Sequence, residues 1–367
     1  MPPLTGLKVL DFSTLLPGPL ASLILAEAGA QVIKVERPGG EDMRRYAGPF
    51  GEASASFALL NRGKMSLCLD LKSPQDRQRL DPHLAAADIL IEQFRPGVME
   101  RLGLGFGQLH AVNPRLIYCS ITGYGQNGPL CETAGHDINY MAETGALALS
   151  CGADGAPTPP PVLAADIAGG AYPAVVNILL ALLEREKTGQ GRQIDIAMAD
   201  NLFTLLYWGL AAGFAAGDWP RPGADLLTGG SPRYQVYRTS DDRFIAAAPL
   251  EDRFWHVFCD AIGLPADQRD DQRDPRAVIA AVAARVRKVT AEEWRSRFAG
   301  LDACVSVVAS LREAIAHPHF AARGLFTRRV ADGDGHVIPA LPVPVVSGLR
   351  TEDETLGYPR LGHAPPG

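Results

Sequence analysis

Cysteine is scarce in this 367-residue sequence, which contains six cysteines and no CxxC pair. Scattered single cysteines argue against both a disulfide framework and a zinc site. No apolar run reaches the length of about 20 residues that crosses a bilayer. The opening residues, "MPPLTGLKVLDFS", lack the charged and apolar regions of a signal peptide. We therefore expect buried thiols in a reducing compartment and a cytoplasmic location.

The fingerprint of dinucleotide binding is also missing. The first strand-to-helix turn reads "STLLPGPL" instead of G-x-G-x-x-G, which argues against an NAD-dependent enzyme. The chain has no excess of basic residues, since its formal net charge is −6. This balance argues against nucleic acid or a membrane surface as a general partner. With 47% hydrophobic and 21% charged residues, the composition is typical of a globular protein.

The first third of the chain alternates strand and helix signals. Apolar runs typical of buried strands occur at 7–13, 30–36, 64–71, 87–94 and 114–125. Helical patterns lie between several of these runs, at 17–29, 73–87 and 96–104. Such alternation predicts an α/β fold whose mostly parallel sheet is covered on both faces.

The length of the chain favours two domains. Helical stretches at 168–187 and 195–216 complete a large domain over residues 1–216, and the Gly/Pro-rich segment 217–230 is predicted to be a linker. Residues 231–324 are interpreted as a small α+β domain, with a hairpin at 234–250 and helices at 251–264 and 274–300. The proline-rich C-terminal part, 325–367, is predicted to be extended and to complete the large domain.

A histidine and an aspartate stand together at the start of a predicted helix, in "AGHDINYMAETGAL". His136 follows Gly135 at a helix entrance, where backbone N–H groups favour developing negative charge. A thioester carbonyl placed there could be polarised toward an enolate. A structural histidine and an ordinary capping role for Asp137 are the alternative interpretations.

A second aspartate, Asp166, precedes two glycines in "ADIAGGAYPAVV". It could simply satisfy free amides at a helix start. Gly169 and Gly170, however, leave room for a ligand to approach the backbone closely. Pro173 is tolerable only in the first turn of a helix, so we expect this helix to begin near Gly169.

Several cations follow predicted strands, where open α/β sheets bind ligands. They are Arg37, Arg62, Lys64, Lys72 and Arg95. Each could be a solvated surface charge, but a group of them converging on one edge would suit a polyphosphate ligand. Glu251 follows an apolar strand in "AAPLEDRFW" and could be either a helix-start carboxylate or a functional one.

Nearly the whole chain resembles CoA-transferase family III, the CaiB/BaiF family, and within it the α-methylacyl-CoA racemase branch. The motifs that carry this resemblance occur in order along the chain, beginning with "LKVLDFSTLLPGPLASLILAEAGAQVIKVERPGG". The others are "NRGKMSLCLDLKSP", "FRPGVMERLGLG", "NPRLIYCSITGYGQNGP", "AGHDINYMAETGAL", "ADIAGG" and "TGQGRQIDIAMAD".

The resemblance implies a large Rossmann-like domain, a smaller α+β domain and an interlocked homodimer. It assigns His136 and Asp166 as the catalytic pair that flanks the substrate α-carbon, supported by Glu251 of the small domain from the other chain. It also implies CoA contacts along the large domain, at Arg37, Leu69, Asp70, Leu71, Lys72, Arg95, Ala134, Gly135, Asp137, Ile138, Asn139 and Tyr140. The acyl-CoA thioester is then the substrate, and no metal or redox cofactor is required.

Three functions remain open at this point. In a racemase, His136 and Asp166 exchange protons on opposite faces of the α-carbon of a 2-methylacyl-CoA. In a CoA-transferase, Asp166 attacks the thioester and carries the acyl group as an anhydride. A protein that only binds acyl-CoA would need neither residue. The histidine favours the racemase, because transferases of this family need no second proton carrier opposite the aspartate. The chain departs from the racemase pattern at Pro173, which falls in the helix of the aspartate.

Overall fold

The computed structural model describes residues 1–152 and 154–363, which fold into two compact units. The first unit contains Met1–Thr144, Pro161–Leu205 and the chain from His319 onward, and the second contains Gly145–Pro160 and Leu206–Pro318. The predicted domain limits differ from these units, because 145–160 and 206–216 belong to the second unit.

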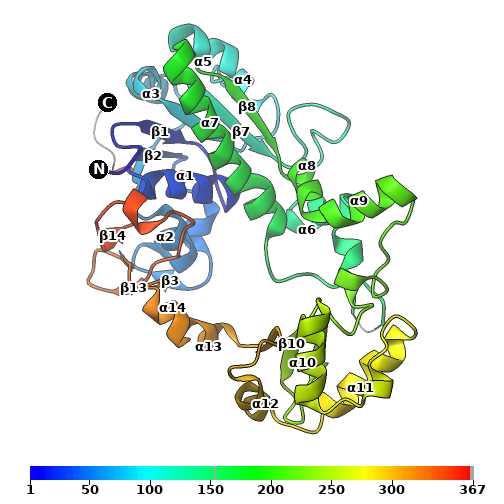
Figure 1. The fold of residues 1–367 in the computed structure, drawn as a ribbon. Helices are drawn as coiled ribbons and strands as arrows, with labels where there is room; N and C mark the ends of the chain where they lie inside the picture. The colour runs from blue at the N-terminus through cyan, green and yellow to red at the C-terminus, as the bar shows by residue number, and fades with distance from the viewer. Residues whose placement is uncertain (153, 364–367) are drawn as a thin grey trace. The chain divides into compact units, whose positions relative to one another are not determined.

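A six-stranded parallel sheet forms the centre of the first unit (Figure 1). Its order is β5 (Met65–Cys68), β2 (Gln31–Glu36), β1 (Lys8–Asp11), β6 (Ile89–Glu92), β7 (Ile117–Thr122) and β8 (Gln193–Ala197). The chain runs outward from β1 to β2 and β5, then returns to the other side of β1 with β6. This reversal creates a topological switch point at the carboxyl ends of β1 and β6, where open α/β sheets bind ligands. The predicted fold class is confirmed.

Helices cover both faces of this sheet. On one face, Leu80 and Leu84 of α3 (Pro74–Ala86), Met99 of α4 (Val98–Arg101) and Leu109 of α5 (Phe106–Val112) pack in a single apolar core with the strands. On the other face lie α1 (Pro17–Glu27) and α7 (Tyr172–Thr188), as Figure 1 shows. Nearly every residue of α1 is buried, and its prolines stand in the first turn, where a missing N–H costs nothing.

Two predicted helices are wrong in extent. Residues 195–216 begin within β8, whose sequence "QIDIA" pairs in parallel with β7 as the edge strand, and helix follows only as α8 (Met198–Leu202) and α9 (Tyr207–Ala216). The predicted helix at 274–300 is two helices, α11 (Pro275–Val286) and α12 (Ala291–Phe298). The break occurs because the Thr290 hydroxyl caps a new helix by accepting the Glu293 N–H.

The C-terminal part packs onto the first unit as a small three-stranded sheet of β12 (Arg329–Ala331), β13 (Val337–Pro339) and β14 (Thr355–Gly357). The Tyr358 hydroxyl donates to the Phe50 carbonyl at 2.6 Å. Phe50 lies in β3 (Pro49–Phe50), which pairs with β4 (Ala53–Ser54) just before α2 (Ala55–Asn61). This sheet therefore ties the end of the chain to its beginning.

The second unit is an antiparallel sheet, in the order β11 (Val305–Val307), β10 (Phe244–Ala247) and β9 (Gln235–Arg238), packed against α10 (Asp252–Ile262), α11 and α12. The predicted hairpin forms from β9 and β10. Trp255, Phe258 and Trp294 fill its core. Beyond β11, the short helices α13 (Leu311–Ile315) and α14 (Pro318–Ala322) follow.

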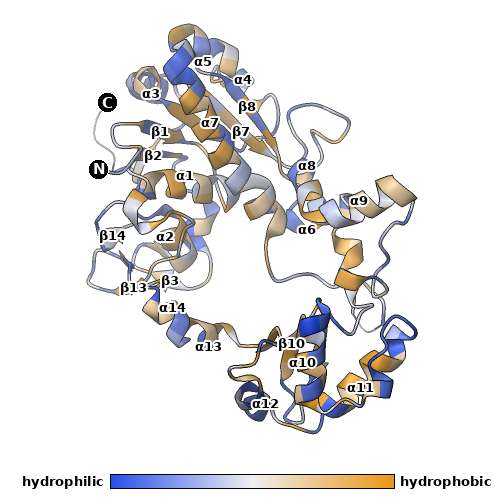
Figure 2. Cartoon of the chain, viewed as in Figure 1, coloured by the Kyte–Doolittle hydropathy of each residue, from blue (hydrophilic) through white to orange (hydrophobic). Residues whose placement is uncertain are grey.

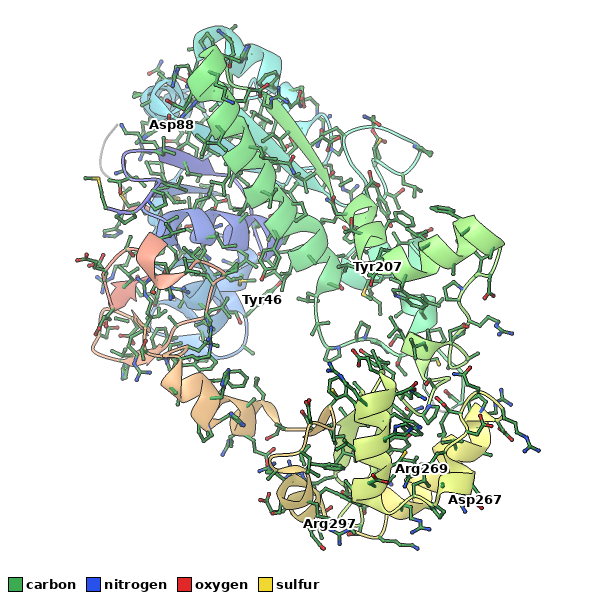
Figure 3. The ribbon with its side chains drawn as sticks, viewed as in Figure 1. Tyr46, Asp88, Tyr207, Asp267, Arg269 and Arg297 are labelled. Carbon is green, nitrogen blue, oxygen red and sulfur yellow. The ribbon has the colours of Figure 1, made fainter. Side chains whose placement is uncertain are left out.

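Apolar side chains are exposed on both units. The helical residues Ala165–Thr188 include an 18-residue stretch with a mean hydropathy of 1.6, so they are long and apolar enough to span a bilayer by length and composition, contrary to the expectation from sequence (Figure 2). A core helix of a soluble protein passes the same test, and 39% of the 18-residue stretch is buried. Val176, Leu180 and Leu183 of α7 are 55%, 58% and 65% exposed. In the second unit, Tyr207 of α9 is 72% exposed (Figure 3).

Candidate active site

A cavity of about 440 Å³ lies at the switch point of the large sheet. Its walls come from the segments that follow β1, β6 and β7, together with the 131–140 segment, Asp166 and Met198. The residues after β1 are Thr14, Leu15 and Pro17, those after β6 are Gln93, Phe94, Arg95 and Pro96, and those at the end of β7 are Ile121, Thr122 and Gly123. The cavity thus occupies the place where the sheet topology predicts a ligand.

His136 lines this cavity as the N-cap residue of α6 (Asp137–Glu143). Its backbone N–H donates to Asn139 Oδ1 at 3.0 Å, and its carbonyl accepts the Asn139 N–H at 2.8 Å. This reciprocal pair fixes the backbone from which the imidazole projects. Because α6 has only seven residues, its dipole contributes less to anion stabilisation than the sequence suggested.

Tyr140 holds the peptide that precedes His136. Its hydroxyl donates to the Gly135 carbonyl at 2.6 Å, and burial raises its pKa to about 12, so it remains a donor at neutral pH. A Cβ atom at Gly123 or Gly135 would lie 2.5 or 2.7 Å from the Tyr140 ring. Only glycine therefore fits at either position while Tyr140 keeps this place.

Asp166 reaches the same cavity from a π-helical turn, Ala165–Ala171. Its backbone N–H donates to Oδ1 of Asp137, a side chain that is only 6% exposed, at 2.9 Å. Burial and, to a smaller extent, the negative charge of Asp137 raise the pKa of Asp166 to about 6, and His136 opposes the rise. Asp166 can therefore hold or release a proton near neutral pH.

The expected CoA contacts divide between this cavity and a second one of about 480 Å³. Arg95, Ala134, Gly135, Asn139 and Tyr140 line the first cavity, and Arg37, Leu69, Asp70, Leu71 and Lys72 line the second. Thr14 and Phe94 line both, so the two cavities are neighbours. Arg37 is exposed and pairs with Asp42 at 2.6 Å.

Two of the five sequence-selected cations do not face either cavity. Arg62 is buried and pairs with Glu27 at 2.8 Å. Lys64 is buried as well and bonds Asp11 at 3.2 Å and Asn61 Oδ1 at 2.8 Å. These charges neutralise carboxylates inside the unit, so the hypothesis that they bind a polyphosphate is wrong.

Three further predicted residues lie elsewhere. Asp137 is beneath the cavity wall, where it accepts the Asp166 N–H, and Ile138 is 41% exposed and is not among the lining residues. Glu251 is the exposed N-cap residue of α10 in the second unit, and its side chain makes no capping bond. Within residues 1–152 and 154–363, no cluster of three or more His, Cys, Asp or Glu side chains could hold a metal ion.

The geometry of a half-buried carboxylate and a histidine on one cavity at the switch point agrees with sequence comparison. A model of CoA-transferase family III matches residues 4–364. The chain belongs to this family. It is 38% identical to the human alpha-methylacyl-CoA racemase over 88% of this chain and 82% of that protein. It is 33% identical to the acetyl-CoA:oxalate CoA-transferase of Acetobacter aceti, over 98% of this chain and 93% of the relative.

Solved structures of the family have the same fold. A CaiB/BaiF family protein from Brucella suis superimposes with a TM-score of 0.83 at 29% identity, covering 98% of this chain and 96% of that one. The chain is therefore an enzyme of a family that contains CoA-transferases and racemases, and acyl-CoA compounds are the substrates expected for such an enzyme.

Several polar residues that line the cavity were not predicted from the sequence, and one of them, Thr122, has a hydroxyl that is unpaired among the described residues. Thr122 is 8% exposed, and its hydroxyl has no hydrogen-bond partner in the part of the chain that the structure describes. A signal was available, because Thr122 ends a buried parallel strand at the ligand-binding edge of the sheet.

Proposed function

We propose that this enzyme is an acyl-CoA racemase that interconverts the stereoisomers of a 2-methylacyl-CoA. The observation that carries the proposal is that His136 and Asp166, which are 30 positions apart in the sequence, line one cavity at the switch point. A racemase of this kind needs two proton carriers, one for each face of the α-carbon.

In one direction, the ionised carboxylate of Asp166 removes the α-proton and becomes a neutral acid, while the thioester becomes an enolate. Protonated His136 then donates a proton to the opposite face of the α-carbon and becomes neutral. For the other stereoisomer the roles are reversed, so no group is consumed. The raised pKa of Asp166, about 6, suits this exchange, because both of its protonation states are accessible near neutral pH.

The enolate oxygen needs a hydrogen-bond donor. Thr122 supports such a role, because its buried hydroxyl lacks a partner and its side chain lines the cavity. A donor aimed at the oxygen where charge develops lowers the barrier more than it strengthens substrate binding.

CoA extends, in this proposal, from the first cavity into the second. Lys72 and Arg37 would then meet its phosphates, because both cations line the second cavity at the carboxyl ends of the strands. The reacting end of the thioester would lie beside His136 and Asp166.

A CoA-transferase is the second candidate, favoured by the 33% identity to the oxalate CoA-transferase over 98% of this chain. In that reaction an Asp166 oxygen attacks the thioester carbonyl, the C–S bond breaks, and CoA leaves as the thiolate while an acyl-aspartyl anhydride forms. The thiolate then attacks the aspartyl carbonyl of the anhydride, which releases the first acid and leaves an aspartyl-CoA thioester. A second carboxylate attacks this thioester to form a new anhydride and release the thiolate, which attacks the new acyl group, so the second acyl-CoA forms and Asp166 is freed. The half-buried carboxylate of Asp166 suits either reaction, but the transferase reaction does not use His136 as a proton carrier.

Solvent exchange separates the two candidates. Incubation of one stereoisomer of a 2-methylacyl-CoA in D₂O should give deuterium at the α-carbon together with inversion, and His136→Ala should abolish inversion. Transfer of CoA to an added carboxylic acid, with hydroxylamine trapping an acyl group on Asp166, would instead identify a transferase. Tight binding of the CoA ester with neither reaction would identify a binding protein.

We also propose that the enzyme is an interlocked homodimer located in the cytoplasm, with Glu251 supporting His136 of the other chain. Exposed Val176, Leu180 and Leu183 on α7 support the idea of a covering partner. Light scattering should give twice the chain mass, and Glu251→Gln should lower the exchange rate. A monomeric mass would contradict the dimer, and sedimentation with lipid vesicles would contradict the cytoplasmic location.

A further inference from the structure

The turn that carries Asp166 is followed by a proline at a position where an α-helix would have a backbone donor. Residues Ala165–Ala171 are π-helical, and the Tyr172 N–H bonds the Ile167 carbonyl five residues back. In the α-helix that follows, the N–H at position 173 would bond the carbonyl of Gly169, four residues back. Pro173 has no N–H, so it cannot supply that bond.

A side chain from another element supplies it. Asn201, on α8, donates from its amide Nδ2 to the Gly169 carbonyl at 2.8 Å and to the Ala197 carbonyl at 3.2 Å. Asn201 is far from Gly169 in the sequence, so this bond ties the π-turn to the end of β8. Asn201 thus gives the Gly169 carbonyl a donor at the point where Pro173 cannot supply one.

Close packing keeps the π-turn against α8. A Cβ atom at Gly169 would lie 2.3 Å from the Met198 carbonyl oxygen, and one at Gly170 would lie 3.0 Å from Pro17 and 3.1 Å from the Met198 side chain. Both glycines are buried. The turn therefore lies directly on the element that bears Asn201, with no room for a side chain between them.

On the other side, the Asp137 carboxylate accepts the Asp166 N–H at 2.9 Å. The π-turn is held at both ends, by Asp137 near its start and by Asn201 near its end. Single π-turns inside helices occur frequently at functional sites, and this one places a carboxylate on the cavity.

We propose that Asn201 is a positioning residue for Asp166: its amide replaces the backbone donor that Pro173 lacks and fixes the π-turn that brings the carboxylate to the cavity. The catalytic consequence rests on the proposed function, since it assumes that Asp166 transfers a proton. The structural part of the proposal, that the Asn201 amide replaces a backbone donor, does not depend on the proposed function.

The test is a cycle of Asn201→Leu, Pro173→Ala and the double variant. Asn201→Leu removes the donor at similar volume and should lower kcat for α-proton exchange about tenfold, with KM changed less than about twofold, because a displaced proton carrier affects chemistry more than binding. Asn201→Asp, which loses the donor but keeps the shape, should behave alike and serves if the leucine variant folds poorly. In the double variant, the N–H of alanine at 173 should restore kcat to within about threefold of Pro173→Ala alone.

Asn177→Leu is the matched control. Asn177, at an exposed position on α7, donates from Nδ2 to the Pro173 carbonyl at 2.9 Å. Its replacement removes a side-chain amide that bonds the helix after the π-turn but leaves the bond to the π-turn itself in place. This control should keep kcat within about twofold of wild type. Full activity in both Asn201 variants, or a double variant as slow as Asn201→Leu, would overturn the proposal.

Thermal unfolding separates this inference from the proposed function. Asn201→Leu should lower the unfolding midpoint by about 2–4 °C in the wild-type background and by clearly less in the Pro173→Ala background. This difference is expected even if the wild-type enzyme exchanges no α-proton. Equal losses in the two backgrounds would show that Asn201 does not replace the missing donor, whatever reaction the enzyme catalyses.

Discussion

Replacing Asp166 by asparagine should stabilise the protein while it removes the proposed activity. Burial and the charge of Asp137 raise the pKa of Asp166 to about 6, so the folded protein binds the Asp166 proton more tightly than the unfolded chain. Stability from this group is therefore present below the unfolded pKa of about 3.9 and is lost as the pH rises through about 6. At pH 8 the ionised carboxylate weakens the fold.

The size of this effect follows from the pKa. A rise of the pKa from about 3.9 to about 6 corresponds to about 3 kcal/mol of stability for a fully buried group, since a shift of one pKa unit is worth about 1.4 kcal/mol. Partial exposure of Asp166 reduces the expected value to about 1–2 kcal/mol. Asparagine has the same shape and no charge, so Asp166→Asn should gain this amount at pH 8 and lose the gain progressively toward pH 5.

Denaturant unfolding of wild type and Asp166→Asn between pH 5 and pH 8 measures the effect. Glu132→Gln, a change to an exposed carboxylate in the segment that precedes His136, is the control and should give no gain that grows with pH. A destabilised Asp166→Asn, or a gain that does not depend on pH, would refute the idea that the carboxylate is held at the site at the expense of stability.

Three further changes test other parts of the site. Asp137→Asn keeps an oxygen that can accept the Asp166 N–H but removes a negative charge, so the pH at which Asp166 ionises should fall below about 6 in the pH profile of kcat. Gly135→Ala places a Cβ 2.7 Å from the Tyr140 ring, so kcat for exchange should fall more than about tenfold and the unfolding midpoint should drop. Thr122→Val keeps the side-chain shape but removes the unpaired hydroxyl, and kcat should fall about tenfold with little change in KM; an unchanged kcat would remove Thr122 from the mechanism.

The sequence predicts the parallel sheet well, because its strands are short apolar runs separated by helical patterns and turn residues. The strand β8 was not predicted, because in "QIDIA" polar and apolar residues alternate over only five positions and the segment continues directly into α8. Such an edge strand is recognised only when its partner β7 is in place. The break between α11 and α12 was missed because both flanking segments have a helical pattern.

The candidate site was predicted less completely than the fold. His136 and Asp166 were selected by residue type and local context, and only the folded sheet brings them to one cavity. Arg62 and Lys64 were selected by the same reasoning as Arg37, but their partners Glu27 and Asp11 are distant in the sequence, so the buried pairs could not be foreseen. The bond between Asn201 and Gly169 depends on tertiary packing in the same way.

The most direct measurement of the two-carrier mechanism follows deuterium and configuration together, starting from each pure stereoisomer of a 2-methylacyl-CoA in D₂O. Wild type should exchange and invert both. His136→Gln and Asp166→Asn should each exchange one stereoisomer without inversion, and the stereoisomer should differ between the two variants. Exchange of the same stereoisomer by both variants, or inversion that survives in either, would contradict the assignment of one proton carrier to each face.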